Sequence, residues 1–218
     1  MKSRFPCLLA LLLGLSPLSA EDYRPELFAS LKPVYQDDFS CGTLDTSHWQ
    51  IRQGSTWVMK DGVLTGGPSP KEFQEKMVAK GDPSHAGFKP VIWLENVPEN
   101  LVVQFRLRYD GTVPHPKFPF IDVGHHVHTL IFGKDKTTLV LKKNQKTIEV
   151  AAPLLALNQW SDVTIELKKG SLLLVIDGTK TRFDDPLIDM TGQQQIDFKG
   201  LDGGGILLDR VVASEGVE

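Results

Sequence analysis

The chain has 218 residues, with 24 Lys and Arg against 27 Asp and Glu and a net charge of −3 at pH 7. Because the basic residues form no block, the composition argues against a nucleic-acid partner. The length suits one domain, since all-β sandwiches of about 200 to 250 residues commonly remain undivided.

The first twenty residues predict a secretory signal peptide. Lys2 and Arg4 precede the apolar run 7–15, and the small residues of "SPLSA" suit cleavage after residue 20. No later stretch reaches the roughly 18 apolar residues of a membrane span. We therefore expect a signal peptide at 1–20, and a single domain at 21–218 that is secreted, periplasmic or extracellular, with no membrane span.

Removal of the signal peptide changes the charge and the cysteine count. Two of the 24 Lys and Arg leave with it, which gives 22 against 27 acidic residues and a net charge of −5. Cys7 also leaves, so Cys41 has no internal disulfide partner. Since its motif contains no other Cys or His, we expect Cys41 to be a small buried hydrophobe.

Apolar residues recur at period two along most of the remaining chain, and Gly, Pro, Asn and Asp interrupt the runs. In the clearest run, 100–111, Phe105 and Leu107 alternate with Arg106 and Arg108, so one face should be buried and the other wet. The turn sequences "KDGV", "KKNQKT", "KKGS" and "DGTK" predict antiparallel neighbours. We expect strands at 34–39, 56–66, 91–95, 100–111, 126–132, 137–143, 146–151, 160–183, 194–200 and 205–213.

Only two short segments have a helical pattern. The first is 69–77, with Ser69 as its N-cap and Pro70 in its first turn, and the second is 153–157. The first lies within 66–90, which lacks strand periodicity and should form a long surface excursion. Excursions of this length are often functional. The pattern as a whole predicts an all-β fold.

Four stretches carry a family resemblance: "DDFSCGTLDTSHWQIRQGSTWVMKDGVLTG" (37–66), "LVVQFRLRYDG" (101–111), "QWSDVTIELKKGSLLLVIDGTKT" (159–181) and "ILLDRVVAS" (206–214). Together they resemble the 3-keto-disaccharide hydrolase family of secreted bacterial concanavalin A-like domains. The resemblance implies a two-sheet antiparallel jelly-roll sandwich of the lectin and glucanase type, with carbohydrate as the ligand. It also implies cleavage of a keto-disaccharide as the alternative to binding alone.

The catalytic signature of laminarinase-type glycosidases is missing. Those enzymes carry ExDxxE on a strand, whose alternation places a nucleophile and an acid on one face. The nearest string here is "FIDVGH" (120–125). Asp122 occupies the central Asp position, but Phe120 and His125 stand where the two glutamates belong. A glycosidase of that type is therefore excluded.

Three of the six histidines cluster at positions 125, 126 and 128. In an extended strand His126 and His128 share one face, while His125 faces the other way and closes a turn after Gly124. A zinc site would need a third ligand. The candidates are His115, Asp122, Glu95 and His85. We favour the alternative, in which His126 and His128 contact sugar hydroxyls in a shallow groove, and we expect no metal or other cofactor.

Three tryptophans, Trp49, Trp57 and Trp160, each head a strand and are expected in the core or at the ends of the sandwich. Trp93 is the exception, because Glu95 follows two residues later on the same strand face and adds a carboxylate beside the ring.

Residues of several strands should combine into one carbohydrate-binding surface. We predict that this surface comprises Trp93, Glu95, Arg106, Arg108, His126 and His128. If the protein is an enzyme of the resembled family, His126 or Glu95 is the candidate base that starts elimination from a keto-disaccharide. An interaction module of the cell envelope is a third alternative.

Three aspartates could meet if the first and last strands are neighbours, as is common in jelly rolls. Asp37, Asp38 and Asp209 would then offer carboxylates to a calcium ion. The alternative that we favour is that Asp38 or Asp209 pairs with Arg210 or caps a turn.

Overall fold

The computed structural model describes residues 23–111, 119–142, 144–190 and 192–218. The predicted signal peptide at 1–20 and the candidate ligand His115 lie outside these residues. Over the described ranges the chain forms fifteen strands in two antiparallel sheets, one α-helix and one short 3-10 helix. The two helices are α1 (Lys71–Ala79) and η2 (Pro83–His85).

The larger sheet, sheet A, contains the strand that ends the chain. Its order is β13-β12-β11-β6-β15-β4-β3, and β1 also pairs with β15. The bounds are β13 (Thr179–Asp184), β12 (Ser171–Ile176), β11 (Ser161–Lys168), β6 (Leu101–Asp110), β15 (Gly205–Val217), β4 (Val63–Gly67), β3 (Thr56–Lys60) and β1 (Ser30–Asp37). The first and last strands are therefore neighbours, as predicted.

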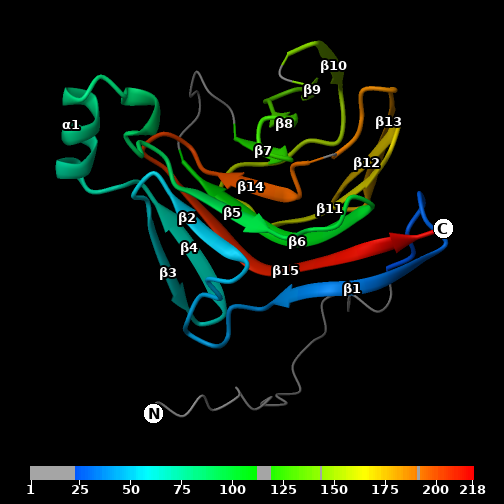
Figure 1. Ribbon diagram of the computed structural model, residues 1–218, viewed down its shortest axis with the longest axis horizontal. Coiled ribbons are helices and arrows are strands. Elements are labelled where there is room, and N and C mark those ends of the chain that lie inside the picture. The colour runs from blue at the N-terminus through cyan, green and yellow to red at the C-terminus, as the bar shows by residue number, and fades with distance from the viewer. Residues whose placement is uncertain (1–22, 112–118, 143, 191) are drawn as a thin grey trace.

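The second sheet, sheet B, has the order β10-β9-β8-β7-β14-β5-β2. The bounds are β10 (Lys146–Val150), β9 (Thr137–Leu141), β8 (His128–Phe132), β7 (Phe120–Val123), β14 (Gln195–Lys199), β5 (Val91–Glu95) and β2 (Trp49–Arg52). Figure 1 shows α1 at one end of the molecule, where it lies beside the strands of sheet B. None of the helices within the described ranges has the length and apolar character needed to cross a membrane.

The core lies between the two sheets and follows from the alternation of each strand. On β6, Phe105 and Leu107 are buried and point toward sheet B, whereas Arg106 and Arg108 point outward. Phe105 meets Phe198 of β14 edge to face, with 5.1 Å between the ring centroids. This contact joins the sheets directly, and the prediction of a two-sheet antiparallel sandwich is confirmed.

Several local predictions are wrong. Strands β2 and β7 were not expected, and 153–157 forms no helix, because Leu155 turns into the core and the Thr137 hydroxyl donates to the carbonyl of Pro153. Ser69 does not cap α1, since its hydroxyl donates instead to the carbonyl oxygens of Ala86 and Gly87. Cys41 is exposed, since it lies in the loop between β1 and β2.

Candidate functional site

A cavity of about 430 Å³ lies on the outer face of sheet B, between the sheet and the 66–90 excursion. We call it the cleft. Its lining comes from the sheet (Arg52, Trp93, Lys199), from the turn after β7 (His125, His126) and from the excursion (Phe73, Met77, Asp82, His85). The volume lies within the roughly 300–1,000 Å³ of small-ligand sites.

The turn between β7 and β8 carries two of the cleft histidines. The amide of Val127 donates to the carbonyl of Gly124 at 2.9 Å, which closes a tight turn with His125 and His126 at its corner. Gly124 and His126 both have positive φ, +70° and +58°. The two imidazole centroids are 4.0 Å apart. The chain thus turns where an extended strand was predicted, and both rings reach the cleft.

The floor of the cleft is a buried ionic network. Asp122 and Asp197 stand directly opposite each other on β7 and β14 and are 1% and 0% exposed. Two carboxylates in this position would repel each other. Lys199 is ion-paired to both of them, at 3.1 Å from Asp197, and is itself buried. The pairing compensates the charges that burial would otherwise destabilise.

His125 is held by this network. Its Nδ1 lies 2.8 Å from Oδ2 of Asp197, whose other oxygen accepts a hydrogen bond from Gln195 at 2.7 Å. A carboxylate at Nδ1 fixes the orientation and tautomer of an imidazole and leaves Nε2 as an acceptor for a ligand. The His125 side chain is 33% exposed, so a ligand in the cleft can reach it.

Trp93 lies beside this histidine but its ring is partly covered. The ring centroids of Trp93 and His125 are 4.6 Å apart, and the Arg52 guanidinium lies 4.0 Å from the Trp93 centroid. The second contact is a cation–π interaction, which orients the guanidinium. Together these groups make one platform that presents a flat cation and an imidazole.

His126 contributes a neutral imidazole to the cleft. Burial lowers the pKa of His126, and the positive charge of Lys199 lowers it further. The neutral form is therefore favoured near pH 7. A neutral imidazole both donates and accepts a hydrogen bond, which matches a sugar hydroxyl.

The excursion forms the opposite wall. Phe73 of α1 packs on Gly54, where a Cβ atom would come within 2.9 Å of the ring. His85 at the end of η2 is held by Asp82, whose oxygens lie 2.7 and 2.9 Å from Nδ1. These hydrogen bonds, with one from Ser84, lower the pKa of Asp82. The wall therefore presents a second carboxylate-oriented imidazole.

The predicted surface is only partly formed. Trp93 and His126 line the cleft, and Glu95 lies on the same face of β5, where its carboxylate accepts a hydrogen bond from Gln50 at 2.6 Å. Arg106 and Arg108 belong to sheet A, so the prediction that they share a face with Trp93 is wrong.

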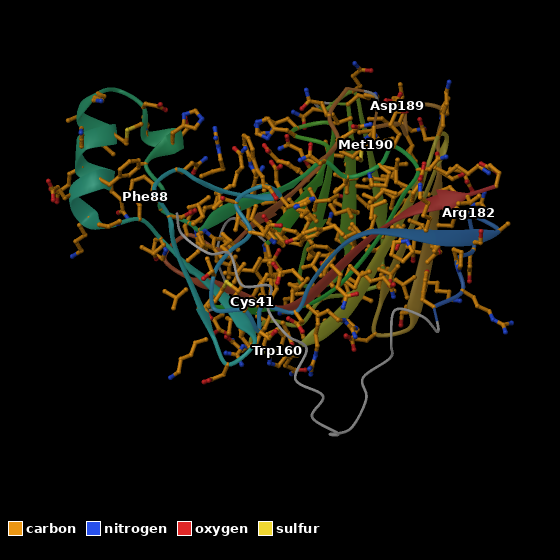
Figure 2. All side chains as sticks on the ribbon, turned by 60° about the horizontal axis from the view of Figure 1, so that its bottom comes forward. Cys41, Phe88, Trp160, Arg182, Asp189 and Met190 are labelled. Atoms are coloured by element: carbon orange, nitrogen blue, oxygen red, sulfur yellow. The ribbon has the colours of Figure 1, made fainter. Side chains whose placement is uncertain are left out.

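The two arginines are engaged on the outer face of sheet A. Arg106 pairs with Asp209 at 2.9 Å, and Arg108 makes a bidentate pair with Asp110 at 2.7 and 2.9 Å. Both guanidiniums lie over Trp160, at 5.3 and 5.5 Å from its centroid. Figure 2 shows Trp160 well away from α1.

The prediction that His128 belongs to the binding surface is also wrong. Strand β8 begins at His128, which pairs with the inward-facing Val123 and is fully buried. Its Nε2 lies 2.7 Å from the carbonyl oxygen of Asp189. Because the turn ends just before this residue, His126 and His128 are not on one strand face. His128 is part of the interior.

The other candidate ligands of the sequence do not converge. Asp38 accepts hydrogen bonds from the amide and hydroxyl of Ser40, and Asp37 accepts one from the Trp49 indole at 3.1 Å. Asp209 pairs with Arg106 at 2.9 Å. Within the described ranges, no group of three or more His, Cys, Asp or Glu is arranged to hold a metal ion.

Sequence reasoning missed the roles of Arg52 and Lys199 in the cleft. It considered His85 only as a metal ligand and placed His125 in a turn outside the site. Sequence signals existed for His85, which lies in the predicted 66–90 excursion, and for His125. His125 aligned with a catalytic position in "FIDVGH", and the glycine before it permits the turn that brings it to the cleft. The positions of Arg52 and Lys199 depend on which strands become neighbours.

No family model matches the chain, and no curated protein matches its sequence. Solved structures match its fold. A cellulose-induced protein, Cip1, aligns with a TM-score of 0.61 and 12% identity over 85% of this chain and 99% of that one. A laminarinase catalytic domain from Thermotoga petrophila aligns with a TM-score of 0.56 and 9% identity over 87% of this chain and 99% of that one.

A larger protein also matches. The GlcNAcα1-4Gal-releasing endo-β-galactosidase from Clostridium perfringens aligns with a TM-score of 0.63 and 11% identity over 90% of this chain. The chain spans 66% of the length of that structure. At these identities the likeness concerns the fold, which is the predicted concanavalin A-like jelly roll.

Proposed function

We propose that the cleft binds carbohydrate. The observation that carries the proposal is the outer face of sheet B, where a partly exposed imidazole, a guanidinium and an indole form one platform over a fixed ionic floor. Sugars need flat surfaces for their CH faces and oriented donors and acceptors for their hydroxyls. His125 and Arg52 supply both kinds of contact. Trp93 and His126 are the two predicted residues that remain in this site.

Two further points support the proposal. The similar structures include an endo-β-galactosidase and a laminarinase, whose substrates are glycans. The expected signal peptide would place the protein outside the cytoplasm, where polysaccharide is a common ligand, so we propose a secreted protein that meets its glycan there.

A second candidate function, cleavage of a keto-disaccharide, is favoured by the contact between His125 and Asp197. A carboxylate-held imidazole is a suitable general base. His125 Nε2 would take the proton from the carbon beside the ketone, whose C–H electrons form a double bond as the β C–O bond breaks. The leaving oxygen takes a proton from water, and the hydroxide recovers the proton from the imidazole. His125 is a better candidate base than His126 or Glu95, because a buried carboxylate orients it.

Binding is tested on an array of immobilised glycans. Wild-type protein should bind a defined subset, and Trp93→Ala or His126→Ala should weaken that binding by about 1 to 3 kcal/mol with little change in Tm. Arg108→Ala is the matched control, because this arginine lies on sheet A, and its binding should equal that of the wild type. If no glycan is bound, the proposed function is wrong.

Cleavage is tested with a nitrophenyl 3-keto-glucoside, whose elimination releases nitrophenol. If the second candidate is right, the wild type releases nitrophenol, His125→Ala does not, and Arg108→Ala does. Glycan binding without release would leave the cleft as a binding site and reject the enzyme.

A further inference from the structure

We propose that the cleft receives the end of a glycan chain rather than an internal stretch, because the 66–90 excursion closes the groove beyond β2. The inference rests on the proposed carbohydrate binding and names the part of the glycan that is recognised. It follows from how the excursion is fixed, from the direction of the groove and from the chemistry of the wall.

The excursion is a fixed wall, anchored at its neck. The amide of Ser69 donates to the carbonyl of Gly87 at 2.8 Å, so the chain leaves and re-enters the sandwich at one place. A Cβ atom on Gly87 would lie 2.2 Å from the carbonyl oxygen of Gln53, which shows how closely the neck fits the β2–β3 turn. Phe73 adds a second contact, on Gly54. Two separate contacts with the same turn hold the wall in place.

The groove runs from this wall across the strands of sheet B. A second hollow of about 350 Å³ is lined by His126, Thr129, Val140 and Asn144, over β8 and β9. His126 lines both the hollow and the cleft. In the sheet order, β2 and β5 lie at the end beside the excursion, whereas β8 and β9 lie beyond β14 and β7. A chain lying in the groove therefore meets the wall at one end and continues over β8 and β9 at the other.

The wall has the chemistry to contact a terminal sugar. Phe73 and Met77 offer apolar surface to its CH groups, and His85 offers Nε2 to a hydroxyl while Asp82 holds Nδ1. A terminal residue has a hydroxyl where an internal residue has a glycosidic bond. A hydrogen-bond acceptor at the closed end of the groove therefore favours the terminal residue. A further sugar beyond this residue would also collide with the wall.

The chain contains a matched control for His85. Asp45, Ser47 and His48 repeat the spacing of Asp82, Ser84 and His85, and His48 Nδ1 lies 2.9 Å from Asp45. His48 stacks on Tyr35 of β1, with ring centroids 4.1 Å apart. The same local motif thus occurs once in the cleft wall and once against a strand of sheet A.

The test uses arrayed glycans that differ only by one added sugar on the terminal residue. The glycans that the wild-type protein binds should share a terminal residue. We call a glycan capped when one sugar has been added to this residue, and capping should reduce the affinity at least about tenfold. A variant in which a short glycine linker replaces 70–86 should bind capped and uncapped glycans alike, because the neck brings Ser69 and Gly87 together. Equal binding of both by the wild type would overturn the inference, whereas no binding at all would overturn the proposed function.

Point variants keep the inference testable if the protein that lacks 70–86 does not fold. His85→Ala should weaken binding of the uncapped glycan about tenfold, the size of one lost hydrogen bond to a ligand, and should reduce the discrimination between capped and uncapped glycans. His48→Ala should change neither. If His85→Ala retains full affinity and full discrimination, the wall does not contact the terminal sugar and the inference is wrong.

Discussion

His125 on the β7–β8 turn is held by Asp197 of β14 at 2.8 Å, and the same carboxylate lies 3.1 Å from Lys199. One buried aspartate therefore orients the imidazole and balances the lysine. It links the exposed part of the cleft to the interior of sheet B.

Asp197→Asn should destabilise the fold, because it removes a buried charge that has two partners. We expect a loss of about 1 to 3 kcal/mol in the free energy of unfolding, measured by urea denaturation at pH 7. Lys199 keeps Asp122 as a partner, which limits the loss. Asp184→Asn, at an exposed carboxylate on β13, is the control and should leave the free energy unchanged. Equal stability of both variants would contradict this role of Asp197.

Lys199→Met should be more harmful, because it leaves two facing carboxylates buried without a cation. Breaking a buried ion pair from one side typically costs about 3 to 5 kcal/mol. The double variant Lys199→Met with Asp122→Asn should recover part of this loss, since one of the two charges is gone. A double-mutant cycle by urea denaturation measures the coupling. Strictly additive losses would mean that the two side chains do not interact.

Glu166→Gln should loosen the segment before β1. The buried Glu166 carboxylate accepts hydrogen bonds from the Tyr23 hydroxyl at 2.6 Å and from the amides of Glu26 and Leu27 at 2.9 and 2.8 Å. We expect a loss of about 1 to 3 kcal/mol and faster proteolysis at 23–29, followed by mass spectrometry. Glu215→Gln, at an exposed carboxylate, is the control. Unchanged proteolysis would show that the segment is held by apolar packing alone.

His128 should make the fold sensitive to mild acid. Burial lowers the pKa of His128 from about 6.5, and the neighbouring charges of Lys142 and Asp189 oppose each other. The unfolded chain therefore binds a proton more readily than the folded protein. The free energy of unfolding should be fully present above about pH 6.5 and decline as the pH falls below it.

The variant His128→Gln separates this effect from other titrations. Its free energy of unfolding should decline less than that of the wild type between about pH 7 and 5, where most carboxylates remain ionised. Parallel curves for His128→Gln and the wild type would show that His128 does not titrate on unfolding.

Much of the fold could be predicted because alternation acts locally. The run on β6 buries Phe105 and Leu107 and exposes Arg106 and Arg108, as its pattern requires. The site could be predicted less well, because alternation does not reveal which sheet a strand joins. Arg108 and Trp93 were correctly placed on wet faces, but these faces belong to different sheets.

Two further failures have other causes, one local and one long-range. Alternation holds only within a strand, and the turn that contains His126, with its positive φ, lies between the end of β7 at Val123 and the start of β8 at His128. Lys199 looks like any exposed lysine in the sequence, and its burial follows from the register that places Asp122 opposite Asp197. That register is a long-range property, so no short sequence pattern contains it.

The position of β15 constrains how the chain can fold during its synthesis. This strand pairs with β6, β4 and β1, although it follows all three in the sequence. Sheet A therefore cannot close until residues 205–217 have left the ribosome, and the partners of β15 must wait without their central neighbour. Unpaired strand edges are prone to aggregation, so β6, β4 and β1 carry this risk until β15 is added.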